Sequence, residues 1–79
     1  MRWQWENEGE SIRIGLDDDG YTILPVSREA SAETDSVRIW KWDGNAEKPT
    51  LEPSVIWTCR GRTYHFLLSQ GEIRNVHKD

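Results

Sequence analysis

Three side chains in the sequence could act as soft metal ligands, and they are Cys59, His65 and His77. Zinc sites in proteins usually combine four Cys or His ligands, often in closely spaced pairs along the chain. None of these three residues forms such a pair with another. The sequence therefore predicts no bound metal and no cofactor, although a residual metal site could use these three residues.

The sequence shows no recognisable catalytic arrangement. A nucleophilic cysteine needs a nearby cation or a helix N-terminus to lower the pKa of its thiol. Cys59 falls in a predicted strand, and Arg60 and Arg62 follow only in the turn beyond it. There is no nucleophile elbow, no Ser-His-Asp signature and no phosphate-binding glycine loop. The sequence therefore predicts that the chain is not an enzyme.

An acidic run, Asp17-Asp18-Asp19-Gly20, has the residue types of a calcium loop. It lacks the length, because an EF-hand distributes its ligands over twelve residues and closes with a Glu. An Asp-Gly pair between two apolar segments is instead a strong signal for a β-hairpin. We expect a solvated turn, in which Asp17, Asp18 and Asp19 are candidates for contact with a basic protein partner.

Tryptophan is frequent in this chain, with five residues out of 79. Trp40, Trp42 and Trp57 fall in predicted strands, so we expect them to fill the core. Trp3 and Trp5 lie near the N-terminus and are candidates for partner binding, because Trp is enriched among the residues that dominate interface energies.

Apolar residues at every second position predict the strands that hold these side chains. In Ser11–Leu16, residues Ile12, Ile14 and Leu16 share one face. In Thr63–Leu68, residues Tyr64, Phe66 and Leu68 share one face, and His65 and Leu67 share the other. Glycine-containing turns at Asp17–Gly20, Arg60–Arg62 and Ser69–Glu72 separate the strands. The predicted strands are Ser11–Leu16, Tyr21–Val26, Val37–Trp42, Val55–Cys59, Thr63–Leu68 and Ile73–Val76, and part of Met1–Glu10 has a strand-like alternation.

The predicted fold class is all-β, a small antiparallel meander sheet or sandwich of five to six short strands. Ser27–Ser36 is expected to be a loop with at most one helical turn. Pro25 cannot donate a ladder hydrogen bond, so its strand is expected to lie at an edge or to end there. A chain of 79 residues can bury only one core, which predicts a single domain over residues 1–79.

The charge balance narrows the class of partner. Ten Lys and Arg against fourteen Asp and Glu give a net charge of −4. Duplex DNA is therefore an unlikely partner, because binding to its backbone needs clustered cations. No apolar segment is long enough to span a membrane, and the single Cys excludes an internal disulfide. A cytoplasmic protein is expected.

The segment from Ile39 to Val55 carries a motif with Gly, Pro, Thr and Ser at fixed offsets. Its residues are Trp40, Trp42, Gly44, Pro49, Thr50, Pro53 and Ser54, and His65-Phe66 and Gly71-Glu72-Ile73 follow further along. The motif resembles a family of short uncharacterised proteins encoded by tailed phages and prophages. This resemblance implies a cytoplasmic location in the bacterial host. Many of those relatives have Cys residues that suggest a zinc site. Because Tyr64 stands where they have Cys, that site is expected to be lost here.

Each residue type in the motif also has a structural explanation. Pro49 and Pro53 restrict the backbone, so they predict a stiff extended crossover. Gly44 permits a turn after Trp42, and Thr50 and Ser54 can satisfy backbone groups in the irregular segment. We therefore expect the motif to be structural.

The sequence favours a small phage-type accessory protein that binds a host or phage protein, including as an inhibitor of a host defence system. Two alternatives remain open at this point. One is a degenerate zinc-binding β module, and the other is a single-stranded nucleic-acid binder that uses exposed Trp. The sequence sets no oligomeric state.

Overall fold

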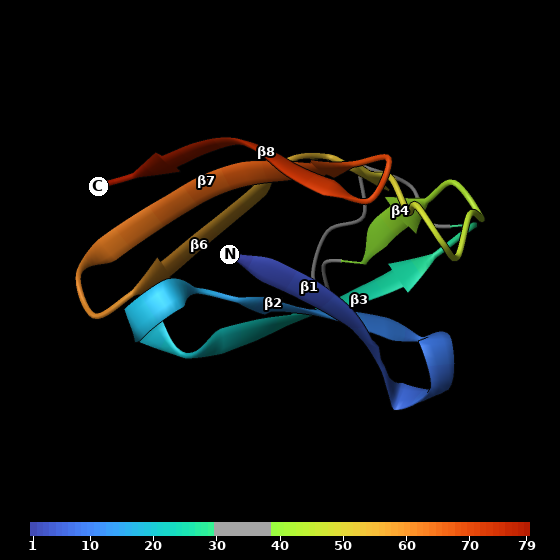
Figure 1. Cartoon of the computed structure of the whole chain (residues 1–79), viewed down its shortest axis with the longest axis horizontal. Helices are drawn as coiled ribbons and strands as arrows, with labels where there is room; N and C mark the ends of the chain where they lie inside the picture. The colour runs from blue at the N-terminus through green and yellow to red at the C-terminus, as the bar shows by residue number, and fades with distance from the viewer. Residues whose placement is uncertain (30–38) are drawn as a thin grey trace.

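A computed structural model describes residues 1–29 and 39–79. In it, the protein consists of short strands arranged in two sheets (Figure 1). The first sheet has the order β1-β2-β3-β4-β5 and the second has the order β6-β7-β8. Two 3-10 turns, η1 (Asn7–Gly9) and η2 (Asp17–Asp19), are the only helical elements of the described residues. The strands are β1 (Arg2–Glu6), β2 (Ser11–Gly15), β3 (Tyr21–Ser27), β4 (Trp40–Trp42), β5 (Leu51–Glu52), β6 (Val55–Cys59), β7 (Arg62–Ser69) and β8 (Glu72–Lys78).

The predicted all-β fold class is confirmed, and the described residues hold more strands than expected. The extra elements include β5, whose two residues give no periodic signal in the sequence. The three predicted hairpin turns connect β2 to β3, β6 to β7, and β7 to β8. The predicted loop Ser27–Ser36 and the first residues of the predicted strand Val37–Trp42 fall mainly outside the described residues.

The first sheet departs from a simple meander at one place. β3 pairs with β4 in parallel, through Val26 opposite Trp40, whereas the other pairs are antiparallel. β3 therefore lies inside the sheet, so the prediction of an edge strand at Pro25 is wrong. Pro25 pairs with Ser11 of β2, and β4 pairs with β3 only beyond it, at Val26 and Ser27. The missing N–H of Pro25 thus falls where one side of β3 has no strand partner.

The core lies between the two sheets, as in a small sandwich. The alternation predicted from the sequence is confirmed on both sides of this core, with His65 exposed between the buried Tyr64 and Phe66. The fully buried side chains come from both sheets and include Ile12, Ile14, Leu16, Leu24, Val55, Tyr64, Phe66 and Leu68.

The tryptophans follow the prediction only in part. Trp40 is buried and Trp42 packs against the core, but Trp57 is 38% exposed, so its assignment to the core is wrong. Trp57 pairs with the inward-facing Tyr64, yet β6 is an edge strand of its sheet. Val55, at the start of the same strand, is fully buried. The first sheet therefore covers the beginning of β6 and leaves the ring of Trp57 partly in solvent.

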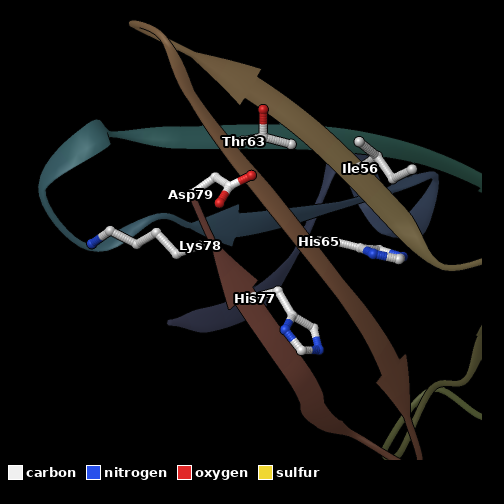
Figure 2. A pocket seen from close by; sticks show the side chains of 6 residues that line it. All are labelled: Ile56, Thr63, His65, His77, Lys78 and Asp79. Carbon is white, nitrogen blue, oxygen red and sulfur yellow. The ribbon is translucent and has the colours of Figure 1, made fainter.

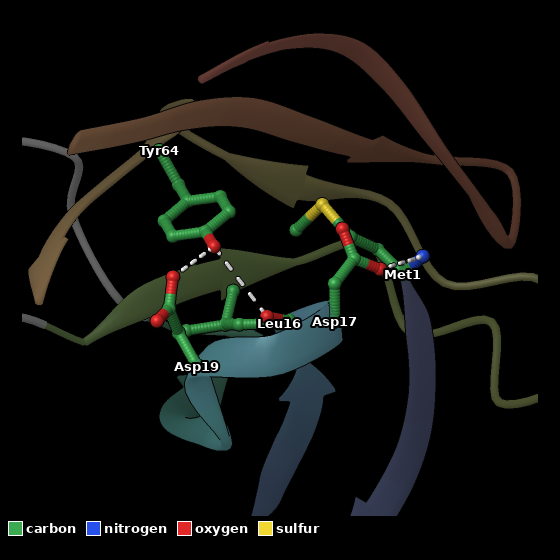
Figure 3. A network of polar contacts seen from close by, with 5 residues as sticks. All are labelled: Met1, Leu16, Asp17, Asp19 and Tyr64. Carbon is green, nitrogen blue, oxygen red and sulfur yellow. Dashed lines mark hydrogen bonds and ion pairs between the residues drawn. The ribbon is translucent and has the colours of Figure 1, made fainter. Parts of the chain in front are cut away.

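A polar network connects the acidic turn to the second sheet (Figure 3). The hydroxyl of Tyr64 donates to a carboxylate oxygen of Asp19, and the carbonyl of Leu16 lies 3.5 Å from the same hydroxyl. Arg62 adds an ion pair to Asp19 at 3.6 Å. The hydrogen bond from Tyr64, followed by the charge of Arg62, lowers the pKa of Asp19 below its ordinary value of 3.8.

This network predicts acid sensitivity. Because the pKa of Asp19 is lowered in the folded state, its carboxylate stabilises the fold fully above the ordinary value of 3.8, and this stabilisation is lost as the pH falls toward the lowered value. Asp19→Asn should therefore lower the urea midpoint at neutral pH, and its difference from the wild type should shrink below about pH 4. Urea unfolding between neutral and acid pH measures this. Glu10→Gln, at an exposed carboxylate, is the control. If the urea midpoints of Asp19→Asn and the wild type differ by the same amount at neutral and at acid pH, the prediction is contradicted.

Candidate functional site

The outer face of the second sheet gathers the two histidines of the chain. Alternation along β7 turns Tyr64 and Phe66 inward and His65 outward. In the sheet register, His65 is opposite Ile56 of β6 on one side and opposite His77 of β8 on the other. The three side chains therefore form one row across the sheet, and all three are exposed (Figure 2).

Ser54 places a hydroxyl group, which can act as a nucleophile, beside this row. It lies directly before β6 and is partly buried. Its Oγ is 3.0 Å from Nε2 of His65. When His65 carries its proton on Nδ1, Nε2 accepts the hydrogen bond from the Ser54 hydroxyl. This is the geometry in which an imidazole can remove the proton of a serine that attacks a carbonyl carbon.

Two open depressions lie beside the histidine pair. One has a volume of about 410 Å³ and is lined by Ile56, Thr63, His65, His77, Lys78 and Asp79 (Figure 2). The other has a volume of about 350 Å³ and is lined by Ser54, His65, Phe66, Leu67, Asn75 and His77. Because His65 and His77 line both, a ligand in either depression would contact the pair.

A bulge in β8 shapes the second depression. The register between β7 and β8 shifts between His65 and Leu67, which pair with His77 and Arg74. Asn75 lies in this shift with a φ of 55°, a left-handed conformation that Asn tolerates better than most residues. The bulge therefore brings the Asn75 side chain into the depression that also contains Ser54 and His77.

The motif before β6 forms its own hydrogen-bonded loop. The Oδ1 of Asp43 accepts from the backbone N–H groups of Asn45 and Thr50, and Oδ1 of Asn45 accepts from two further N–H groups. Thr50 satisfies a backbone group, as expected, because its Oγ1 accepts from the N–H of Gln70 at 2.8 Å. Ser54 was expected to satisfy a backbone group as well, but its hydroxyl contacts the imidazole of His65. Hydrogen bonds from backbone N–H groups to the side chains of Asp43 and Asn45 therefore fix the conformation of the loop that precedes Ser54.

The remaining motif residues lie near this loop. Gly44 has a φ of +90°, which favours glycine, and a Cβ there would lie 2.9 Å from Nε of Arg28. Pro49 is fully buried, and its carbonyl accepts from the N–H of Gly71. Pro53 is partly buried directly before Ser54.

The candidate partner-binding residues do not line either depression beside the histidine pair. Trp3 and Trp5 are half-buried, and their indole N–H groups donate to the carbonyls of Gly71 and Ala46. Asp17 pairs with the N-terminal amine at 3.2 Å, whereas Asp19 belongs to the Tyr64 network. Whether a partner contacts these residues, or Asp18, stays a prediction.

Cys59 does not join the histidines. It lies three positions beyond Ile56 on β6, so alternation places the two residues on opposite faces of the sheet. Among residues 1–29 and 39–79, no group of three or more His, Cys, Asp or Glu side chains could hold a metal ion. The suggested residual site of Cys59, His65 and His77 therefore lacks a common centre.

This placement predicts that the protein retains no zinc. Protein purified without a chelator should contain far less than one zinc per chain by elemental analysis, because two exposed imidazoles without further ligands bind zinc weakly. One tightly held zinc per chain, whose removal unfolds the domain, would contradict this expectation.

The contact between Ser54 and His65 was not predicted from the sequence. A usable signal was present, because the hairpin turn at Arg60–Arg62 sets the register of β6 against β7. Val55 is opposite Phe66 and Ile56 is opposite His65. Ser54, one residue before Val55, is therefore diagonal to His65 on the same face, within reach of a side-chain contact.

A family model matches most of the chain. A family model described as "Bacterial ubiquitination-like system serine protease (BubE)" matches residues 21–76, which include both Ser54 and His65. No curated protein and no solved structure matches the chain. None of the helices in the described part of the chain is long and apolar enough to cross a membrane.

Proposed function

The chain belongs to the bacterial ubiquitination-like system serine protease (BubE) family, and we propose that it is a serine hydrolase that cleaves a peptide bond in a protein of such a system. The observation that carries this proposal is the 3.0 Å contact between Ser54 Oγ and His65 Nε2. The family name and the contact both oppose the sequence-based prediction that the chain is not an enzyme. On this proposal Ser54 is the nucleophile and His65 is the base, and both lie in the segment that the family model matches.

The proposed reaction begins with proton transfer from Ser54 to His65. Nε2 of His65 takes the hydroxyl proton while Oγ attacks the carbonyl carbon of the substrate, which forms a tetrahedral intermediate. The imidazolium then gives this proton to the leaving amine as the C–N bond breaks, and an acyl group remains on Oγ. Water, deprotonated by the same nitrogen, releases the acid and restores the hydroxyl of Ser54.

The open shape of the site favours a large substrate. His65 is exposed, so solvent reaches the base unless the substrate covers it. Exclusion of water strengthens the electrostatic interactions on which the transition state depends. A protein substrate can cover the row, and Ile56, which is 60% exposed beside His65, offers an apolar contact for it. The protein partner expected from the sequence is, on this proposal, the substrate.

An acylation burst tests the proposal. Mixed with excess 4-nitrophenyl acetate, the wild type should release about one equivalent of nitrophenol per chain in a fast phase, because the acyl-enzyme accumulates before water hydrolyses it. Exposed imidazoles also react with this ester. The Ser54→Ala variant, which retains His65 and His77, measures that background. Equal fast phases in the two proteins would contradict the proposal and leave binding of a protein partner as the proposed function.

A further inference from the structure

We propose that His77 is a positioning residue for His65, so that Ser54, His65 and His77 form one hydrogen-bonded unit. This inference rests on the proposed function, because it assigns the third group of that same site. A base that accepts the Ser54 proton through Nε2 must carry its own proton on Nδ1. A neighbouring acceptor for the Nδ1 proton would fix this tautomer and the direction of the ring.

The strand order places His77 on the side of His65 that faces away from Ser54. β7 lies between β6 and β8, Ser54 leads into β6, and His77 is on β8. His65 and His77 are direct register partners, and their ring centroids are 6.4 Å apart with an interplanar angle of 41° (Figure 2). His65 therefore has the serine on one flank and the second imidazole on the other.

Other polar groups around His65 fit the role less well. Asp79 directly follows β8 and lies opposite Thr63, to whose carbonyl its N–H donates, so it is diagonal to His65, whereas His77 is directly opposite. Asn75 lies in the bulge, on the far side of the register shift. The ammonium of Lys78 is 5.7 Å from the ring of Tyr64, which faces inward. His77 is thus the acceptor directly opposite His65.

The present ring separation requires a small adjustment. A direct N–H···N bond between two imidazoles brings the ring centroids to about 5 Å, less than the separation in the structure. His77 is exposed, and exposed side chains change rotamer within nanoseconds. Catalytic hydrogen bonds are often longer in the free enzyme and tighten when substrate binds. Rotation of the His77 side chain toward His65 is therefore sufficient to bring the two rings within hydrogen-bond distance.

The tautomer of His65 tests the inference without any substrate. Two-bond ¹⁵N–¹H spectra at about pH 8, where imidazoles are ordinarily neutral, distinguish Nδ1–H from Nε2–H. The wild type should show His65 as the Nδ1–H form, whereas His77→Ala should shift it toward the Nε2–H form that free imidazole side chains favour. His77→Gln should retain the Nδ1–H form, because its amide oxygen can accept. Asp79→Asn removes the carboxylate that is the other acceptor in this depression, and it should leave the His65 tautomer unchanged if His77 is the positioning residue.

The steady-state kinetics of peptide hydrolysis by the His77 variants give a second measurement. His77→Ala should lower kcat about 10–100-fold with KM nearly unchanged, and His77→Gln should recover most of the loss. An unchanged His65 tautomer in His77→Ala, or a tautomer change in Asp79→Asn, would overturn the inference. If the wild type shows no Ser54-dependent hydrolysis, the proposed function fails, while the spectra still decide whether His77 orients His65.

Discussion

Replacing Ser54 by Ala or His65 by Gln should lower kcat for a hydrolysed peptide on the order of 10³-fold or more, and the double variant should lose no more than either single variant. The reason is that nucleophile and base act as one unit: without the base, the Ser54 hydroxyl keeps its proton, and without the nucleophile, His65 has no group to activate. Steady-state kinetics of the three variants and the wild type measures this non-additivity.

Two controls make this result specific. Ser69→Ala removes another half-buried hydroxyl, at the end of β7, and should retain nearly full activity. Urea unfolding should show that Ser54→Ala and His65→Gln remain folded, since both side chains lie outside the buried core. Additive losses in the double variant would show that Ser54 and His65 act independently and would contradict the proposed pair.

Phe66→Ala should destabilise the fold by about 3–5 kcal/mol, the usual cost of truncating a buried aromatic side chain. The ring of Phe66 is 1% exposed and lies on the inner face of β7, directly behind the outward-facing His65. Domains of this size have stabilities of only about 5–15 kcal/mol or less, so the variant loses a large fraction of its stability. Urea unfolding monitored by Trp fluorescence measures the change.

The same strand pair provides the control. Ile56, opposite His65 and 60% exposed, occupies the outer face, so Ile56→Ala should change the stability by no more than about 0.5 kcal/mol. A similar cost for both variants would show that the two faces of the second sheet are assigned incorrectly, and with them the outward direction of His65.

Local patterns predicted much of the fold. The period-two alternation around His65 identified the inner and outer faces of β7, because only one face of that strand can meet the opposite sheet. The Asp-Gly and Gly turns located three hairpins for a backbone reason that does not depend on the rest of the chain. The parallel pairing of Val26 with Trp40 was not predictable, because it depends on segments that are distant in the sequence.

The candidate site was harder to predict than the fold. Ser54 and His65 are eleven positions apart and meet only through the register of β6 and β7. From the sequence, Ser54 was expected to satisfy backbone groups of the irregular segment, and His65 was considered as a metal ligand. Exposure of Trp57 was missed for a related reason, since a strand pattern does not say how far the opposite sheet extends.

The central claim is that Ser54 is a nucleophile activated by His65, and covalent labelling tests it most directly. Fluorophosphonates transfer a phosphonyl group to an activated serine hydroxyl and release fluoride. Tandem mass spectrometry after treatment should place one adduct on Ser54 in the wild type and none in Ser54→Ala, and His65→Gln should slow the labelling at least about 100-fold. Labelling of another serine, no labelling at all, or an equal rate in His65→Gln would contradict the claim.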